Sequence, residues 1–147
     1  HARCIRTAVD AADTLCATRG LRFTPLRRRV LELIWQSHRP VGAYDLLDQI
    51  KVERDGAAPP TVYRALDFLM ENGLVHRIES LNAFVGCDHP DAPHQSQFLI
   101  CTSCRRVAEL SDPAIAQRIE TKASGAGFQT ARQTLEVTGT CDACTES

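Results

Sequence analysis

The chain has 147 residues, of which 44% are hydrophobic and 24% charged, and its formal net charge at pH 7 is −1. These proportions are typical of a globular protein, and because the sequence shows neither an apolar run of about 18 residues nor a signal peptide, we expect a cytoplasmic protein with no membrane partner. Residues 1–79 contain 12 Lys or Arg against 10 Asp or Glu, and residues 80–147 contain 5 against 8, so any basic surface for nucleic acid lies in the first half, although a solvated helix face has the same composition.

Two helices are predicted at the start of the chain. The first spans residues 2–18 and ends before a turn at Gly20. The second begins after Thr24, a favourable N-cap residue, with Pro25 at its first position, and ends near Ser37. Its apolar residues recur at helical spacing, which predicts one buried face.

Two further helices and a hairpin follow. A third helix is expected over 42–53, and it ends before a turn rich in Gly and Pro. The fourth begins at Thr61 and ends at Gly73, a typical C-cap residue. Two short extended segments joined by Leu81 and Asn82 then form a predicted β-hairpin, over 74–80 and 83–87. This order of elements is that of a winged helix-turn-helix.

The second half has the pattern of a small α/β unit. Residues 88–97 contain two prolines and few apolar side chains, so they are predicted to be a hinge. Strands are expected over 98–101 and 106–110, a helix over 113–127, and a long strand over 128–139. The fold class is therefore α+β, with a winged-helix domain (1–87), a hinge (88–97) and an α/β dimerisation domain (98–147). A unit of about 50 residues is too small to be stable without a metal, a partner copy or both.

Four of the seven cysteines form two C-x-x-C pairs, one after the first strand of the second half and one at the end of the chain. Four thiolates close a tetrahedron around zinc, and this spacing brings two sulfurs of one turn to the same ion. We therefore predict a structural zinc site, whose ligands are Cys101, Cys104, Cys141 and Cys144. Redox-active C-x-x-C motifs are the alternative, although neither pair opens a helix in a thioredoxin-like pattern.

A second set of candidate ligands is more dispersed. It contains two imidazoles, one thiol and one carboxylate, which suit zinc, and consists of His76, Cys87, His94 and Glu109. Spacing alone does not select these four residues, because a single histidine is more often a surface residue or a satisfied one. Cys4 and Cys16 fit neither ligand set and are expected to be structural or incidental thiols.

Several motifs together resemble the ferric uptake regulator family, most closely its zinc-sensing branch. They are "LRFTPLRRRVLELIW", "PPTVYRALDFLMENGLVHRIES" and "FLICTSCRRVAEL" followed by "CDAC". The resemblance covers the chain from about residue 15 to its end. It implies a winged-helix domain joined by a hinge to a dimerisation domain, a Cys4 structural zinc, and a regulatory site at the four dispersed positions named above.

Departures from the iron-sensing pattern favour zinc. Iron-sensing members have a histidine-rich stretch before the first cysteine pair, where this chain has "SQFLIC" with Phe98. His38 lies about two residues before the position of the family's ligand in the first domain, so we interpret it as a surface residue. His89 is an alternative to His94, which fits the motif better by its distance to Cys101. An iron-sensing or peroxide-sensing regulator remains the alternative within the family.

The fourth predicted helix is the candidate recognition helix. Thr61, Tyr63 and Arg64 lie in its first turn, where side chains reach bases, and Arg64 could pair with guanine. An alternative is that Arg64 contacts a phosphate while Tyr63 packs against the protein. Candidate backbone contacts are Arg22, Arg27, Arg28 and, in the wing, Arg77.

Together these features predict a zinc-dependent repressor of zinc-uptake genes, which binds double-stranded operator DNA as a homodimer and holds about two zinc ions per chain. Metal at the second site would clamp the two halves, so that two recognition helices meet successive major grooves. The sequence contains no catalytic constellation, so no enzymatic activity or small-molecule substrate is expected. A thiol-based redox regulator and a zinc-binding interaction module without DNA binding are rival hypotheses.

Overall fold

The structure is a computed structural model that describes residues 2–37, 39–88, 90 and 96–145. The chain divides into two compact units, residues 1–92 and 93–147. The boundary between them falls inside the predicted hinge. Within the described residues, no helix is both long enough and apolar enough to cross a membrane.

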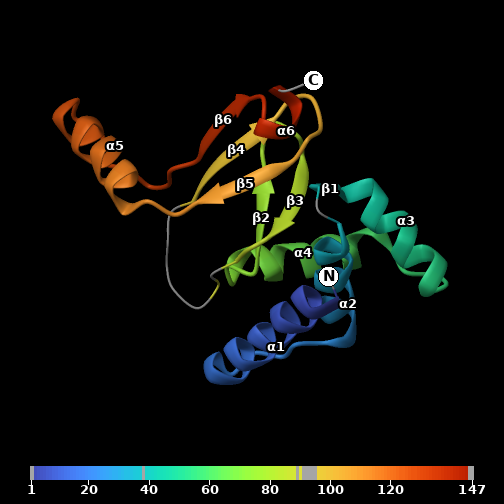
Figure 1. Cartoon of the computed structure of the whole chain (residues 1–147). Coiled ribbons are helices and arrows are strands. Elements are labelled where there is room, and N and C mark those ends of the chain that lie inside the picture. Colours follow the sequence, from blue (N-terminus) through green and yellow to red (C-terminus); the bar gives the residue numbers. More distant parts are fainter. Residues whose placement is uncertain (1, 38, 89, 91–95, 146–147) are drawn as a thin grey trace. The chain divides into compact units, whose positions relative to one another are not determined.

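Among its described residues, the first unit contains four helices (Figure 1). Helix α1 spans Ala2–Arg19, α2 spans Pro25–Gln36, α3 spans Ala43–Glu53 and α4 spans Pro59–Glu71. As predicted, α2 is capped by Thr24, whose hydroxyl accepts a hydrogen bond from the Arg27 N–H. The turn after α1 is closed by Gly20, whose φ of +67° is readily adopted by glycine.

A small antiparallel sheet follows α4. Strands β2 (Val75–Ile78) and β3 (Ala83–Gly86) form the predicted hairpin, and the two-residue strand β1 (Val41–Gly42) pairs with the other edge of β3. Strand β1 was not predicted, because two residues give no recognisable period. The predicted hairpin connection was too short: residues 79–82 form the turn, and Asn82 adopts a positive φ.

One apolar core joins the helices and the hairpin. Its buried side chains lie at helical spacing on α1, α2, α3 and α4, and the hairpin contributes Val75 and Phe84. On α4 the inward residues are Val62, Ala65, Leu66 and Leu69. Burial of one such aliphatic side chain stabilises the fold by roughly 1.5–3 kcal/mol, so this stripe fixes which face of α4 remains exposed.

Helix α4 begins two residues earlier than predicted, at Pro59 instead of Thr61. Proline lacks an N–H, but the first positions of a helix need none, so Pro59 and Pro60 are both accommodated in the first turn. The helix ends as expected, with Asn72 as its C-cap and Gly73 at a φ of +72°.

The second unit is built on a three-stranded sheet of order β5-β4-β6 (Figure 1). Strand β4 (Gln97–Cys101) pairs antiparallel with β5 (Val107–Leu110) and parallel with β6 (Leu135–Gly139). Helix α5 (Pro113–Gly125) connects β5 to β6 and projects away from the sheet, and α6 (Asp142–Thr145) is a single turn. The N-cap of α5 is Asp112, which accepts a hydrogen bond from Ala114 N–H.

The predicted long strand over 128–139 was wrong in its first half. Strand β6 begins only at Leu135, whose partner Gln97 is the first residue of β4. Residues 128–134 therefore lie beyond the end of the strand against which β6 pairs. Alternation of side chains over this stretch was a weaker constraint than the length of the neighbouring strand.

Candidate metal centres and nucleic-acid interface

The four cysteines of the two C-x-x-C pairs converge in the second unit. Their Sγ atoms all lie within 4.8 Å of one another, and the Sγ atoms of Cys104 and Cys141 are 3.8 Å apart. Four sulfurs placed about 2.3 Å from a zinc ion at tetrahedral corners are about 3.8 Å apart. The donor chemistry and the spacing of this cluster therefore fit zinc.

The backbone around Cys101 explains how this cluster is built. Cys101 ends β4, and the turn that follows is closed by a hydrogen bond from Arg105 N–H to the Cys101 carbonyl at 2.9 Å. Arg105 adopts a φ of +66°, which returns the chain into β5. Thr102 N–H bonds to the Gly139 carbonyl at 2.9 Å, which brings the end of β6 beside the first pair.

The pKa values of two of these thiols, Cys101 and Cys144, are shifted in opposite directions. Backbone N–H groups of Cys104 and, next, Cys141 lower the pKa of Cys101 to about 6, because they stabilise its thiolate. The Cys141 N–H lies 3.4 Å from that sulfur. Hydrogen bonds with neighbouring thiols, first Cys141 and then Cys101, raise the pKa of Cys144 to about 12. Of these two thiols, Cys101 therefore forms its thiolate at the lower pH.

The first unit brings together two of the four dispersed candidates. His76 lies on β2 and Cys87 directly follows β3, and an imidazole nitrogen and the Cys87 sulfur lie within 4.8 Å of each other. Cys87 is buried, with 4% of its surface exposed. A buried thiol beside a half-buried imidazole supplies two ligands of the types that zinc prefers.

The other two candidates belong to the second unit. Glu109 is on β5, and its Oε2 accepts a hydrogen bond from the Ser96 hydroxyl at 2.5 Å. Ser96 was not predicted as a site residue, because a single serine before a strand carries no spacing signal. His94 lies outside the described residues, as do its alternative His89 and the surface candidate His38.

The exposed face of α4 carries the three candidates for base contacts. Thr61 and Arg64 are exposed one turn apart, and 43% of the Tyr63 surface is exposed. Arg64 lies opposite the buried stripe of α4, and Thr61 and Tyr63 flank the stripe on either side. This position at the start of an outward-facing helix is what contact with base edges requires.

The predicted backbone-contact arginines differ in their surroundings. Arg22 is exposed, whereas the Arg27 guanidinium stacks over the Phe68 ring at 3.7 Å and donates to the Arg22 carbonyl. Arg28 forms an ion pair of 2.7 Å with Asp13. These contacts hold Arg27 and Arg28 to neighbouring helices.

Arg77, in the β2–β3 hairpin, also has hydrogen-bond and ion-pair partners in its own hairpin. Arg77 is exposed, and its guanidinium donates to Asn82 Oδ1 at 2.8 and 3.2 Å. It also lies 3.4 Å from a Glu79 carboxylate oxygen. The two partners fix where this charge sits along the hairpin.

Outside both ligand sets, the two remaining cysteines differ in burial. Cys16 is buried in α1, where burial raises the pKa of its thiol, and Cys4 is exposed on the same helix. None of the seven cysteines, all within the described part of the chain, forms a disulfide.

A winged helix-turn-helix unit is followed in the chain by a small α/β unit with four converging thiols. The protein is therefore of the winged-helix class, with a candidate metal centre in its second unit. The sequence profile of the ferric uptake regulator family matches residues 18–138. The chain belongs to this family, so the predicted resemblance and fold class are confirmed.

Known relatives refine the comparison. The zinc uptake regulation protein of Escherichia coli K12 is 42% identical over 136 residues, which covers 92% of this chain and 80% of the relative. The crystal structure of holo XcZur is 51% identical with a TM-score of 0.88, covering 95% of this chain and 97% of that one. A zinc uptake regulator complexed with zinc and DNA is 40% identical with a TM-score of 0.91, and the match covers 97% of this chain and 95% of that one.

Proposed function

We propose that this protein is a zinc-responsive transcriptional regulator that represses zinc-uptake genes by binding operator DNA as a homodimer. The similarity to zinc uptake regulators supports this function, including one relative whose structure was solved with zinc and DNA. Family membership also supports the prediction that the chain is a regulator and not an enzyme. The observation that carries the metal dependence is the convergence of four thiols at the spacing of a zinc tetrahedron.

The structural zinc would be held by Cys101, Cys104, Cys141 and Cys144. Bound there, zinc supplies folding energy by linking the end of β4 to the C-terminal turn. The second unit needs this link, because its buried residues are few among those described: Gln97, Phe98, Ile100, Cys101 and Ala116. Redox chemistry at these thiols is the weaker hypothesis, since four grouped sulfurs match a closed ligand set.

The regulatory zinc would be held by His76, Cys87, His94 and Glu109, which gives about two zinc ions per chain. The proximity of His76 and Cys87 supports the first half of this ligand set. The hydrogen bond from Ser96 would orient the Glu109 carboxylate, as outer-shell groups do in metal sites. Because these ligands come from both sides of the boundary between the units, we propose that metal selects one arrangement of the units, the one that binds DNA.

An iron-sensing regulator is less well supported by the second unit. Phe98 stands where iron-sensing members have a histidine, and its side chain is buried in β4 with 4% exposed. A buried phenyl ring offers no ligand atom. The position therefore serves the core of the sheet.

The homodimer would form through the second unit. Several apolar side chains there remain exposed, and they are Leu99, Leu110, Ile119, Phe128 and Val137. Helix α5 buries only Ala116 among its residues. Apolar surface of this extent on so small a unit favours association with a second copy.

The test is selection of DNA from a randomised duplex pool at buffered zinc, followed by binding measurements on the recovered sequence. We expect a palindromic sequence that a dimer binds in the presence of zinc. A chelator that removes the regulatory zinc but leaves the four-cysteine site filled should release the DNA. Recovery of no preferred sequence at any zinc concentration would contradict the proposal. Equal binding with and without zinc would contradict the metal dependence.

A further inference from the structure

Strand β3 and helix α2 approach so closely at Gly86 that no side chain fits between them. A Cβ atom built on Gly86 would lie 2.2 Å from Cε2, 2.3 Å from Nε1 and 2.7 Å from Cζ2 of Trp35. The indole therefore rests directly on the backbone of β3. By contrast, a Cβ on Gly125 would have no atom within 4 Å other than its chain neighbours and the backbone of its own helix.

The indole lies behind the two proposed ligands of the first unit. Successive residues of a strand point to opposite faces, so Gly86 faces away from the side of its neighbours Val85 and Cys87. His76 is the register partner of Val85, which places it on the same side as Cys87. The hydrogen-bond ladder continues to Cys87, whose N–H donates to the Leu74 carbonyl at 3.0 Å.

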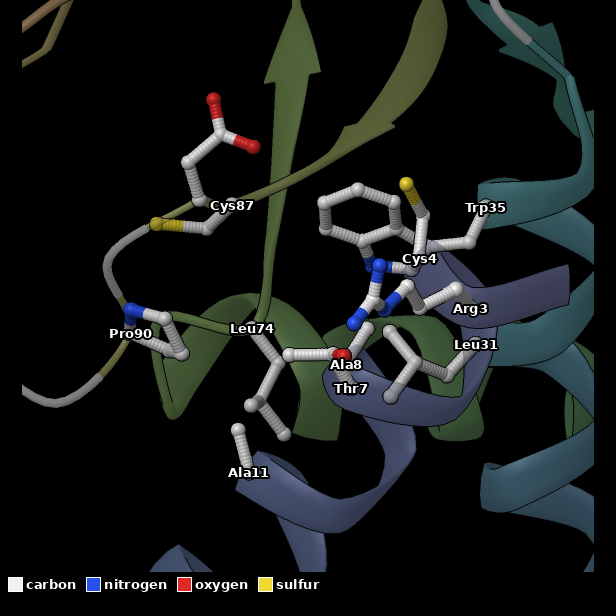
Figure 2. Close-up of a pocket in the computed structure, with 11 residues that line it drawn as sticks. Arg3, Cys4, Thr7, Ala8, Ala11, Leu31, Trp35, Leu74, Cys87 and Pro90 are labelled. Atoms are coloured by element: carbon white, nitrogen blue, oxygen red, sulfur yellow. The ribbon is translucent and has the colours of Figure 1, made fainter. Parts of the chain in front are cut away.

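Trp35 also forms a wall of a cavity of about 300 Å³ in this unit (Figure 2). Leu31 and the α1 residues Ala8 and Ala11 line it, and Cys87 lies at the same cavity. The neighbours of Trp35 on α2, Leu33 and Ile34, are buried in the core and hold the helix in place. A displaced indole could therefore enter the cavity without moving α2.

We propose that Trp35 is a positioning residue for the regulatory metal site: its indole braces β3 at Gly86 and so holds the Cys87 thiol beside His76. Gly86 is equally necessary for this role, because only a residue without a side chain permits the contact between β3 and the Trp35 indole. This role rests on the proposed function, which assigns a regulatory ion to these ligands. Trp35 itself touches no metal and acts only through the strand.

The test compares zinc binding by Gly86→Ala, Trp35→Leu and the double variant, with Gly125→Ala as the matched control. Zinc is titrated against a chromophoric competitor, so that the tightly held ion of the four-cysteine site and the second ion are measured separately. We expect Gly86→Ala to weaken the second ion by about tenfold or more, as loss of outer-shell support does elsewhere. The first ion and the control variant should be unaffected.

The double variant distinguishes a specific effect on the position of Cys87 from a general loss of structure in the first unit. Leucine at position 35 removes all three indole atoms that the new methyl group would meet, so affinity for the second ion should recover toward that of Trp35→Leu alone. Trp35→Leu should itself weaken the second ion several-fold, because the brace is lost, and it provides the decisive comparison if Gly86→Ala does not fold.

The outcomes are distinguishable. Unchanged second-ion affinity in both single variants would overturn the positioning role and leave the proposed function standing. A wild-type chain that binds one zinc ion only would overturn the regulatory site, and the positioning role with it. Loss of both ions together in folded Gly86→Ala would also count against a role specific to Cys87.

Discussion

Replacement of Arg64 by alanine tests whether α4 recognises bases. Arg64 is exposed in the second turn of α4, opposite the stripe that packs against the core, so its removal should leave the fold intact. A bidentate contact between arginine and guanine contributes about 1–3 kcal/mol of discrimination. This corresponds to a factor of roughly 5 to 160 for each recognition helix. In a dimer with two equivalent helices, the lower limit multiplies to about 30-fold.

The assay is fluorescence anisotropy with the selected duplex at saturating zinc, repeated over a range of salt concentrations. Arg118→Ala is the matched control, because Arg118 is exposed on α5 in the second unit. A base contact predicts that Arg64→Ala loses affinity for the selected sequence while its binding to random duplex changes little. The salt dependence should then remain nearly that of the wild type.

A contact with phosphate would give a different result. Affinity would fall equally for selected and random duplex, and the slope of log K against log salt would decrease by about 1 for each lost contact. That result, or no loss at all, would refute the argument that Arg64 recognises a base.

The remaining predictions concern stability and the structural metal. Cys101→Ser should lose the first zinc ion and the cooperative melting of the second unit, whereas the control Cys4→Ser, at an exposed cysteine outside both ligand sets, should retain both. Metal analysis and thermal denaturation followed by circular dichroism measure these two properties. A Cys101→Ser protein with a full zinc content would contradict the assignment of the four-cysteine zinc site. Thr24→Ala should destabilise the first unit by about 1 kcal/mol, because the Arg27 N–H loses its cap, while Thr24→Ser should not. Denaturant unfolding measures this difference, and equal stability of the two variants would contradict the capping role.

Much of the first unit could be predicted from the sequence, because its signals are local. Thr24 followed by Pro25 marked the start of α2, and Gly73 marked the end of α4. The apolar spacing of α4 also fixed which face is buried, and hence which side chains are exposed. By contrast, the pairing of β1 with β3 depends on the tertiary fold and has no local signal.

The second unit shows where local patterns are insufficient. The alternating pattern before Leu135 predicted a strand, but the length of β4 limits the ladder, and β4 is almost 40 residues away in sequence. The two cysteine pairs were predictable as one site, because each pair already places two sulfurs on one turn. Ser96 beside Glu109 and Trp35 behind Gly86 could not be predicted, since both depend on contacts between distant segments.

The measurement that tests the central claim most directly is a titration of DNA binding against free zinc, for the wild type and for Cys87→Ser. We expect wild-type affinity to rise steeply over the range in which the second ion binds, by up to about a hundredfold, which corresponds to a coupling of about 1–3 kcal/mol. Cys87→Ser should keep its first zinc ion and its dimeric state, yet bind the duplex weakly at every zinc concentration in this range. A Cys87→Ser protein whose DNA binding follows the wild-type curve would contradict the account.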